Sequence, residues 1–154
     1  MASWEDWKPK ERISVDRQYM LHALVAALRS TCGRLQGGCV LVKGDDILSS
    51  GRNGAPRGLP HCSCGPEAPC TASVHAEANA IAFAARKHGG AEGATLYSTH
   101  APCEACAGML INTGIVRVAF LHQYRSDKGI SLLWAAQVRV HQLSGTFTLP
   151  ERPT

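Results

Sequence analysis

The sequence predicts an α/β fold in which helices pack in layers against a sheet. Helical and β-like segments alternate along most of its 154 residues, and two of the predicted helices end at glycines, Gly89–Gly90 and Gly114. This alternation favours a layered sheet over a helical bundle. The length and the 45% apolar content are typical of one globular domain with a substantial core. We therefore expect residues 1–154 to form a single domain.

The first third of the chain predicts a helix followed by a hairpin. Residues 16–30 carry apolar side chains at helical spacing, and Ser14 precedes them as an N-cap residue. Two short β-like segments, GCVLVKG (38–44) and DILSSG (46–51), are joined by a turn at Gly44, Asp45 and Asp46. Residues 51–70 are dense in Gly, Pro and Cys and read as a long loop. A loop of this length is usually functional or held by something.

The rest of the chain predicts alternating helices and strands. The segments are a helix over 75–90, a strand over 94–99, a helix over 103–114, a strand over 115–120, a helix over 129–137 and a strand over 138–143. The last residues, 144–154, show no clear pattern.

Charge and hydropathy narrow the classes of function and location. No apolar run reaches the ~18 residues that a membrane-spanning helix needs. The N-terminal segment MASWEDWKPKER lacks the apolar core of a secretory signal. A cytoplasmic location without a membrane partner is therefore expected. The formal charge of +4 is too small to indicate a nucleic-acid surface, and it suits an anionic small substrate.

Cysteine is frequent in this sequence. In a reducing compartment, clustered cysteines bind metal more often than they form disulfides. The seven residues are Cys32, Cys39, Cys62, Cys64, Cys70, Cys103 and Cys106.

Two short motifs, VHAEANA (74–80) and APCEAC (101–106), each lie where the chain is predicted to enter a helix. Cys103 and Cys106, three positions apart on a first helical turn, point the same way. Amide donors and the dipole at a helix start favour thiolates. With His75 they supply three ligands, which leaves a tetrahedral zinc its fourth position for water.

Glu77 completes this set as a base. Two thiolates offset the charge of Zn²⁺, so its water is less acidic than in an all-histidine site, and a nearby base helps. Glu77 lies two residues from His75, so it can face the cavity without binding the metal. Proton transfer by such a group typically contributes on the order of 10²–10⁴ in rate.

The two motifs, H-x-E and P-C-x-x-C, together form the signature of zinc nucleobase deaminases. His75–Glu77 and Pro102–Cys106 match it in full. The alternatives are a structural zinc knuckle and a thioredoxin-like cysteine pair, and neither explains Glu77.

Beyond these motifs, the sequence resembles the deoxycytidylate (dCMP) deaminase family of the cytidine deaminase-like superfamily, from about residue 19 to residue 140. NGxPxG followed by a cysteine is typical of the nucleotide branch of that superfamily. The resemblance implies a three-layer α/β/α fold with a central five-stranded mixed sheet, zinc-dependent hydrolysis of dCMP to dUMP and ammonia, and a homo-oligomer, a dimer or hexamer. The matching stretches are RSTC (29–32), NGAPRGLPHC (53–62), VHAEANAI (74–81), EGATLYST (92–99), PCEAC (102–106) and INTGIVRV (111–118).

The resemblance assigns His75, Cys103 and Cys106 as zinc ligands and Glu77 as the proton shuttle. Arg52, Arg57 and Lys128 are alternatives to Arg125 as the phosphate-binding residue, since arginine can bond two phosphate oxygens. Asn53 could instead be a turn residue before Gly54. The candidate substrate-binding residues are Asn53, Ala76, Ser98, Thr99, Tyr124 and Arg125.

Some members of this family hold a second, structural zinc at positions that correspond to Cys32 and Cys62. Cys70, with Cys64 or His61, would complete a tetrahedron and tie the long loop to the first helix. The alternative is a set of free buried thiols. Cys39 lies in a predicted strand and is expected in the core.

The sequence therefore indicates a zinc-dependent dCMP deaminase of pyrimidine nucleotide biosynthesis. Arg52 stands where the family usually has an aromatic residue, so the same chemistry on another target stays open: a modified cytosine nucleotide, a nucleoside or a base in nucleic acid. A non-catalytic, zinc-stabilised binding protein is the rival from another class.

Overall fold

The computed structural model describes residues 12–65, 70, 72–145 and 147. The expectation about a secretory signal falls on residues 1–11, which lie outside this part of the chain. Of the predicted irregular tail, only Ser144, Gly145 and Phe147 are described, and none of them belongs to a helix or strand.

The strands form one mixed five-stranded sheet in the order β2-β1-β3-β4-β5, as the resemblance implied. β1 is antiparallel to both of its neighbours, whereas β3, β4 and β5 run parallel. The parallel pairs are joined by helices, as such crossovers require. The strands are β1 (Gly38–Lys43), β2 (Asp46–Arg52), β3 (Thr95–His100), β4 (Arg117–His122) and β5 (Arg139–Gln142).

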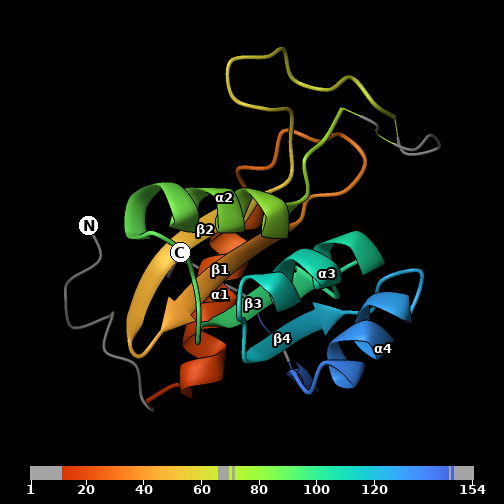
Figure 1. The fold of residues 1–154 in the computed structure, drawn as a ribbon. Helices are drawn as coiled ribbons and strands as arrows, with labels where there is room; N and C mark the ends of the chain where they lie inside the picture. The colour runs from red at the N-terminus through yellow and green to blue at the C-terminus, as the bar shows by residue number, and fades with distance from the viewer. Residues whose placement is uncertain (1–11, 66–69, 71, 146, 148–154) are drawn as a thin grey trace, which may run out of the picture.

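Helices cover both faces of the sheet, which gives three layers (Figure 1). Side chains that alternate along β1 pack on opposite faces of the sheet, so each face needs its own cover of helices. Cys39 and Leu41 belong to the core under α2, α3 and α4, whereas Val40 and Val42 belong to the core under α1. None of the described helices has the length and hydrophobicity that crossing a membrane requires. The helices are α1 (Val15–Ala27), α2 (Ala76–His88), α3 (Glu104–Asn112) and α4 (Lys128–Ala135).

Most helix ends lie where local sequence placed them. The Ser14 side chain accepts a hydrogen bond from the Arg17 amide at 3.2 Å, as an N-cap residue does. α2 stops at Gly89, whose φ of 75° only glycine adopts readily. After α3, Gly114 has a φ of 80°, and the next amide, that of Ile115, bonds back to the Leu110 carbonyl. This pairing is a Schellman motif.

α1 is shorter than predicted, ending at Ala27 rather than at Ser30. Ser30 leaves the helical path because its hydroxyl donates to the Asn53 carbonyl at 2.9 Å, across 23 residues of sequence.

The hairpin turn is also tighter than expected, since Asp46 is already paired with Lys43. Gly44, with a φ of 60°, occupies the first central position, which fits a type II′ turn.

The topology brings several element ends to one edge of the molecule. β1 begins there, β2, β3 and β4 end there, and α2 and α3 start there. Gly51 allows α2 to lie directly on β2, because a Cβ at this position would overlap the Ala76 carbonyl. The loops before β1 and after β2 lie together beyond this edge (Figure 1).

Candidate metal centre and main cavity

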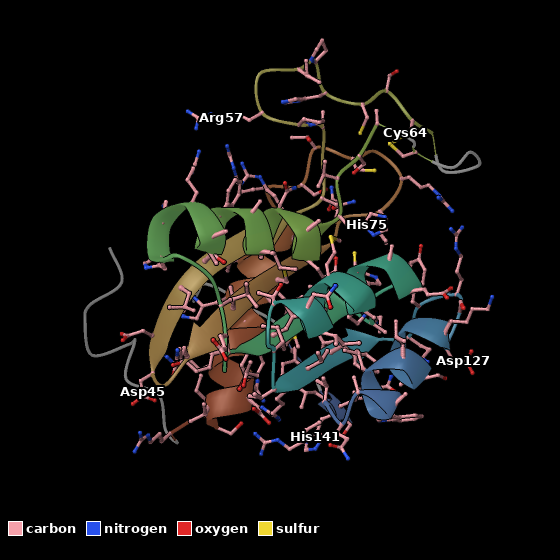
Figure 2. All side chains as sticks on the ribbon, viewed as in Figure 1. Asp45, Arg57, Cys64, His75, Asp127 and His141 are labelled. Carbon is pink, nitrogen blue, oxygen red and sulfur yellow. The ribbon has the colours of Figure 1, made fainter. Side chains whose placement is uncertain are left out.

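The three predicted zinc ligands lie together where two helices begin. His75 is the N-cap residue of α2, Cys103 is the N-cap residue of α3, and Cys106 lies in the first turn of α3. The His75 Nδ1 atom is 3.5 Å from the Cys103 sulfur and 3.4 Å from the Cys106 sulfur. All three ligand atoms lie within 4.8 Å of one another, close enough to share one ion. Figure 2 shows His75 at the start of α2.

The electrostatics of this group favour a cation. Hydrogen bonds from the Cys106 thiol and the His75 imidazole lower the pKa of Cys103 to about 3. The same contacts raise the pKa of His75 and, together with burial, that of Cys106. The three groups thus share protons around one thiolate. A nitrogen and two sulfurs in this arrangement fit zinc, which would take the place of those protons.

Glu77 is buried beside this group and lines the same cavity. Its side chain lies in the first turn of α2 and is only 6% exposed. Burial raises the pKa of its carboxyl above the ordinary value, although its own backbone amide and the nearby imidazole work in the opposite direction. A raised pKa makes the carboxyl easier to protonate, which suits a group that accepts a proton and then releases it.

The main cavity, about 380 Å³ in volume, contains this group at its wall. The structure therefore brings the zinc ligands, Glu77 and the whole predicted substrate-binding set to one place. The predicted residues along its wall are His75, Glu77, Cys103, Asn53, Ala76, Ser98, Thr99, Tyr124 and Arg125.

Asn53 lines the main cavity and also holds the loop before β1 through hydrogen bonds. Its Oδ1 atom accepts hydrogen bonds from the Ser30 hydroxyl at 2.7 Å and from the Gly37 amide at 2.8 Å. Its Nδ2 atom donates to the Leu35 carbonyl at 2.6 Å.

The end of β3 forms another part of the wall. The Thr99 hydroxyl accepts from the Gly38 amide at 3.1 Å and lies 3.0 Å from the Nδ1 atom of His100. Burial, together with the charge of His122, lowers the pKa of His100. His100 is therefore a neutral imidazole at physiological pH, and it also lines the main cavity.

Two arginines lie at this cavity. Arg125 stacks over the Tyr124 ring at 5.4 Å from its centroid. Arg34, in the loop before β1, was not predicted, because nothing in that loop sets it apart from an ordinary solvated cation. Leu35, Ser73 and Gln123 also line the cavity without a signal in the sequence.

The alternative phosphate-binding residues lie elsewhere. Arg52 and Arg57 border a second cavity of about 420 Å³, together with Arg86. Lys128 is not part of the main cavity wall. In Figure 2, Arg57 and Cys64 lie on opposite sides of the long loop. Arg52, the last residue of β2, and Arg57, in the long loop, therefore line the second cavity and not the main one.

A second set of sulfurs gathers beside the cavity, and we name it the four-cysteine cluster. The sulfurs of Cys32 and Cys64 are 3.5 Å apart. His61 borders the second cavity instead, so the structure selects Cys64 over His61. Cys39, by contrast, is buried in β1, as expected. The sulfurs of the cluster, all within 4.8 Å of one another, belong to Cys32, Cys62, Cys64 and Cys70.

The donor set of this cluster also fits zinc. Burial opposes ionisation of Cys32, but hydrogen bonds from the amides of Leu35 and Arg34 and from the thiols of Cys64 and Cys62 together lower its pKa to about 7. The hydrogen bond with Cys70 raises the pKa of Cys64 to about 12. Four sulfurs around one favoured thiolate match the closed Cys₄ set of structural zinc sites.

Comparison with known proteins agrees with this geometry. The family described as "Cytidine and deoxycytidylate deaminase zinc-binding region" matches residues 13–122. The deoxycytidylate deaminase of Schizosaccharomyces pombe is 37% identical over 144 residues, which is 85% of this chain and 44% of that protein. The deoxycytidylate deaminase of Mycobacterium phage D29 is 37% identical over 120 residues, 68% of this chain and 92% of that protein. The chain thus spans less than half the length of the yeast relative.

A solved structure gives the same result for the fold. The dCMP deaminase of cyanophage S-TIM5, crystallised with dCMP and dUMP, superposes with a TM-score of 0.80 at 30% identity. The match covers 86% of this chain and 99% of that one. By its fold, its motifs and the family match over most of its length, the chain belongs to the deoxycytidylate deaminase family, within the cytidine and deoxycytidylate deaminases.

Proposed function

We propose that this chain is a zinc-dependent hydrolase that converts dCMP to dUMP and ammonia, and that residues 1–154 act as one deaminase domain. The observation that carries the proposal is the buried Glu77 carboxyl in the same cavity as a three-ligand His–Cys–Cys set. A structural zinc site needs neither a free coordination position nor an adjacent acid. The names of the S. pombe and phage relatives support the same reaction.

In this reaction, each residue has a separate task. His75, Cys103 and Cys106 would hold a zinc ion, which would lower the pKa of a bound water. The oxygen of the water would bond to C4 of the substrate as the C4–N bond breaks, and Glu77 would carry the protons of the water to the substrate, one of them to the amino group that leaves as ammonia. The buried Ala76 backbone and the Ser98–Thr99 edge confine the pyrimidine ring and keep bulk water out.

The cations at the cavity support a nucleotide rather than a nucleoside. Arg125 and Arg34 both line the main cavity, and guanidinium groups bond phosphate oxygens in pairs. Tyr124 packs against the core and carries Arg125 over its ring, which limits the positions of that guanidinium. We assign the 5′-phosphate of dCMP to these two arginines, and the side-chain amide of Asn53 to the substrate.

The four-cysteine cluster is proposed as a second, structural zinc site. A closed Cys₄ set leaves no position for water, so its contribution is to folding. Metal analysis of the purified chain is expected to return about two zinc ions per chain. A value near one, with the cysteines of the cluster readily alkylated in the native state, would exclude the second ion.

Turnover of dCMP, deoxycytidine and CMP, measured side by side by ammonia release, tests the substrate assignment. We expect dCMP to have the highest kcat/KM. Equal or better turnover of deoxycytidine would favour a nucleoside deaminase, and turnover of none of the three would favour another target or a non-catalytic binding protein. The cytoplasmic location and the homo-oligomer stay predictions, and light scattering of the purified chain would measure the second.

A further inference from the structure

The four-cysteine cluster and the main cavity share a wall. Cys32 and Cys70 belong to the cluster, and both also line the cavity. A closed metal site that only stabilised the long loop would not need to touch the space proposed for the substrate. This shared wall raises the question of what connects the two sites.

The connection runs through Ser30. The hydroxyl of Ser30 accepts a hydrogen bond from the Cys32 amide at 3.3 Å. The same hydroxyl donates to Asn53, lying 2.7 Å from its Oδ1 atom and 2.9 Å from its carbonyl oxygen. One serine side chain thus links the backbone of a cluster cysteine to an asparagine in the cavity wall.

The side chain of Asn53 is in turn hydrogen-bonded to the loop before β1. Its side chain holds the Leu35 carbonyl at 2.6 Å and the Gly37 amide at 2.8 Å. Residues 31–37 belong to no helix or strand. The described hydrogen bonds that hold this loop join it to Asn53, through Thr31, Leu35 and Gly37, and to the sulfurs of Cys32 and Cys62 in the cluster. Arg34 and Leu35, which both line the cavity, lie between these two anchors.

We propose that Ser30 is a positioning residue that couples the four-cysteine cluster to the main cavity. Filling the cluster with metal fixes Cys32, Ser30 holds Asn53 relative to Cys32, and Asn53 holds residues 33–37 as the cavity wall. The consequence for the enzyme is tighter nucleotide binding with little change in the chemical step, because the three catalytic ligands and Glu77 lie outside this network. This inference rests on the proposed function for its ligand, dCMP, and for the metal in the four-cysteine cluster.

Two variants perturb the coupling from its two ends. Ser30→Ala removes the link and keeps all four cysteines, whereas Cys64→Ser removes a cluster ligand that does not line the main cavity. The matched control is Ser49→Ala, since the buried Ser49 hydroxyl also bonds a backbone carbonyl, that of Ala80 at 2.8 Å, away from this loop. Ser30→Thr keeps the hydroxyl and is expected to restore the wild-type values.

Three measurements are made on the 154-residue chain: zinc per chain, hydrogen–deuterium exchange of residues 33–37, and KM with kcat for dCMP. Ser30→Ala is expected to keep both zinc ions, to speed exchange of residues 33–37, and to raise KM about 5-fold at nearly constant kcat, as the loss of one hydrogen bond predicts. Cys64→Ser is expected to lose one zinc ion and to show the same two changes. Ser49→Ala is expected to lower the melting temperature without changing exchange at residues 33–37.

The double variant Ser30→Ala with Cys64→Ser decides whether the two act through one path. If they do, its KM and its exchange rates will not exceed those of the stronger single variant. Multiplicative effects, or unchanged exchange at residues 33–37 in Ser30→Ala, would overturn the coupling. Failure of the proposed function looks different: no turnover or binding of dCMP by the wild type, with the exchange pattern unaffected. If Ser30→Ala does not fold, hydrogen–deuterium exchange of residues 33–37 is compared between the wild type and Cys64→Ser. Faster exchange in Cys64→Ser would support the coupling, and unchanged exchange would overturn it.

Discussion

Glu77 lies in the first turn of α2, and the surroundings of its side chain set its chemistry. An exposed glutamate at this place would be a permanent anion, which stabilises the helix start and no more. Here the carboxyl is 6% exposed, and burial raises its pKa. Glu104, in the first turn of α3, is equally close in sequence to a metal ligand, yet it is exposed and lies outside the cavity wall. The two acids therefore differ both in burial and in access to the cavity, which is why we assign the proton transfer to Glu77.

We expect Glu77→Gln to lower kcat for dCMP about 10²- to 10⁴-fold, because the amide has the same shape but cannot carry the proton. Zinc content is expected to stay unchanged, since His75, Cys103 and Cys106 remain. The matched control is Glu104→Gln, which should keep wild-type kcat. Steady-state kinetics with metal analysis makes the comparison, and full activity in Glu77→Gln would remove this residue from the mechanism.

Arg125→Ala and Arg34→Ala are each expected to lower kcat/KM for dCMP about 10- to 100-fold, the size of a lost bond to a charged group. The value for deoxycytidine should change little, because that substrate has no phosphate to lose. Arg57→Ala, at the second cavity, serves as the control. Equal losses for both substrates would mean that these arginines shape the cavity rather than bind phosphate.

At the scale of elements, the site depends on how closely helices approach the sheet. α2 places His75 and Glu77, and it lies on β2 at Gly51, where a Cβ would overlap the Ala76 carbonyl. Gly129, at the start of α4, has the same relation to the Pro102 carbonyl, next to Cys103. The two helix starts that carry the candidate metal ligands are therefore each held by a close backbone contact, which a side chain at Gly51 or Gly129 would force apart.

Gly51→Ala is expected to lower the free energy of unfolding by about 1–3 kcal/mol, because the contacted atoms are backbone and cannot move aside as a flexible side chain would. Gly108→Ala is the control: Gly108 lies inside α3 with nothing within 4 Å of an added Cβ. There alanine should raise the free energy of unfolding by up to about 1 kcal/mol, from helix propensity. Urea denaturation measures both, and a neutral Gly51→Ala would show that α2 can shift freely on β2.

At the scale of the whole molecule, one ion pair joins the α1 layer to the sheet. Both guanidinium nitrogens of Arg117, in β4, bond the two carboxylate oxygens of Asp16, in α1, at 2.8 Å. The Tyr97 hydroxyl, in β3, also donates to Asp16 at 2.8 Å. Residues separated by about a hundred positions in sequence thus meet in one network. The hydrogen bond from Arg117 lowers the pKa of Asp16, despite the opposing effect of burial.

This pKa shift predicts an acid-side loss of stability. A carboxyl whose pKa is lower in the folded state stabilises that state above its unfolded pKa of about 3.9, and the contribution disappears as pH falls through the folded value. Asp16→Asn is therefore expected to cost about 1 kcal/mol at pH 7, discounted for the partial exposure of Asp16, and to flatten the fall in stability below pH 4. Denaturation at a series of pH values tests this, and parallel curves for both proteins would exclude the ion pair as the cause.

Much of the fold could be predicted because its signals are local. Ser14 marks a helix start through its side-chain hydroxyl, Gly89 and Gly114 mark helix ends through their backbone preferences, and the strands alternate their side chains between two cores. The proposed catalytic group was equally visible, because His75 with Glu77 and Cys103 with Cys106 are each placed by one helix start. Resemblance to a known family then supplied Asn53, Tyr124 and Arg125, which no local pattern distinguishes from turn or surface residues.

What the sequence determined by itself is the set of groups on which the proposed chemistry depends: the candidate ligands, the acid beside them and the two helix starts that present them. Only the tertiary structure decided how the two loops beyond the sheet edge meet. In that structure α1 ends at Ala27, and Arg34 lines the main cavity. Cys64, and not His61, joins the four-cysteine cluster, and Arg52 lines the second cavity. The physical reason is that these outcomes depend on hydrogen bonds such as Ser30 to Asn53, across 23 residues, which have no periodicity for a sequence to display.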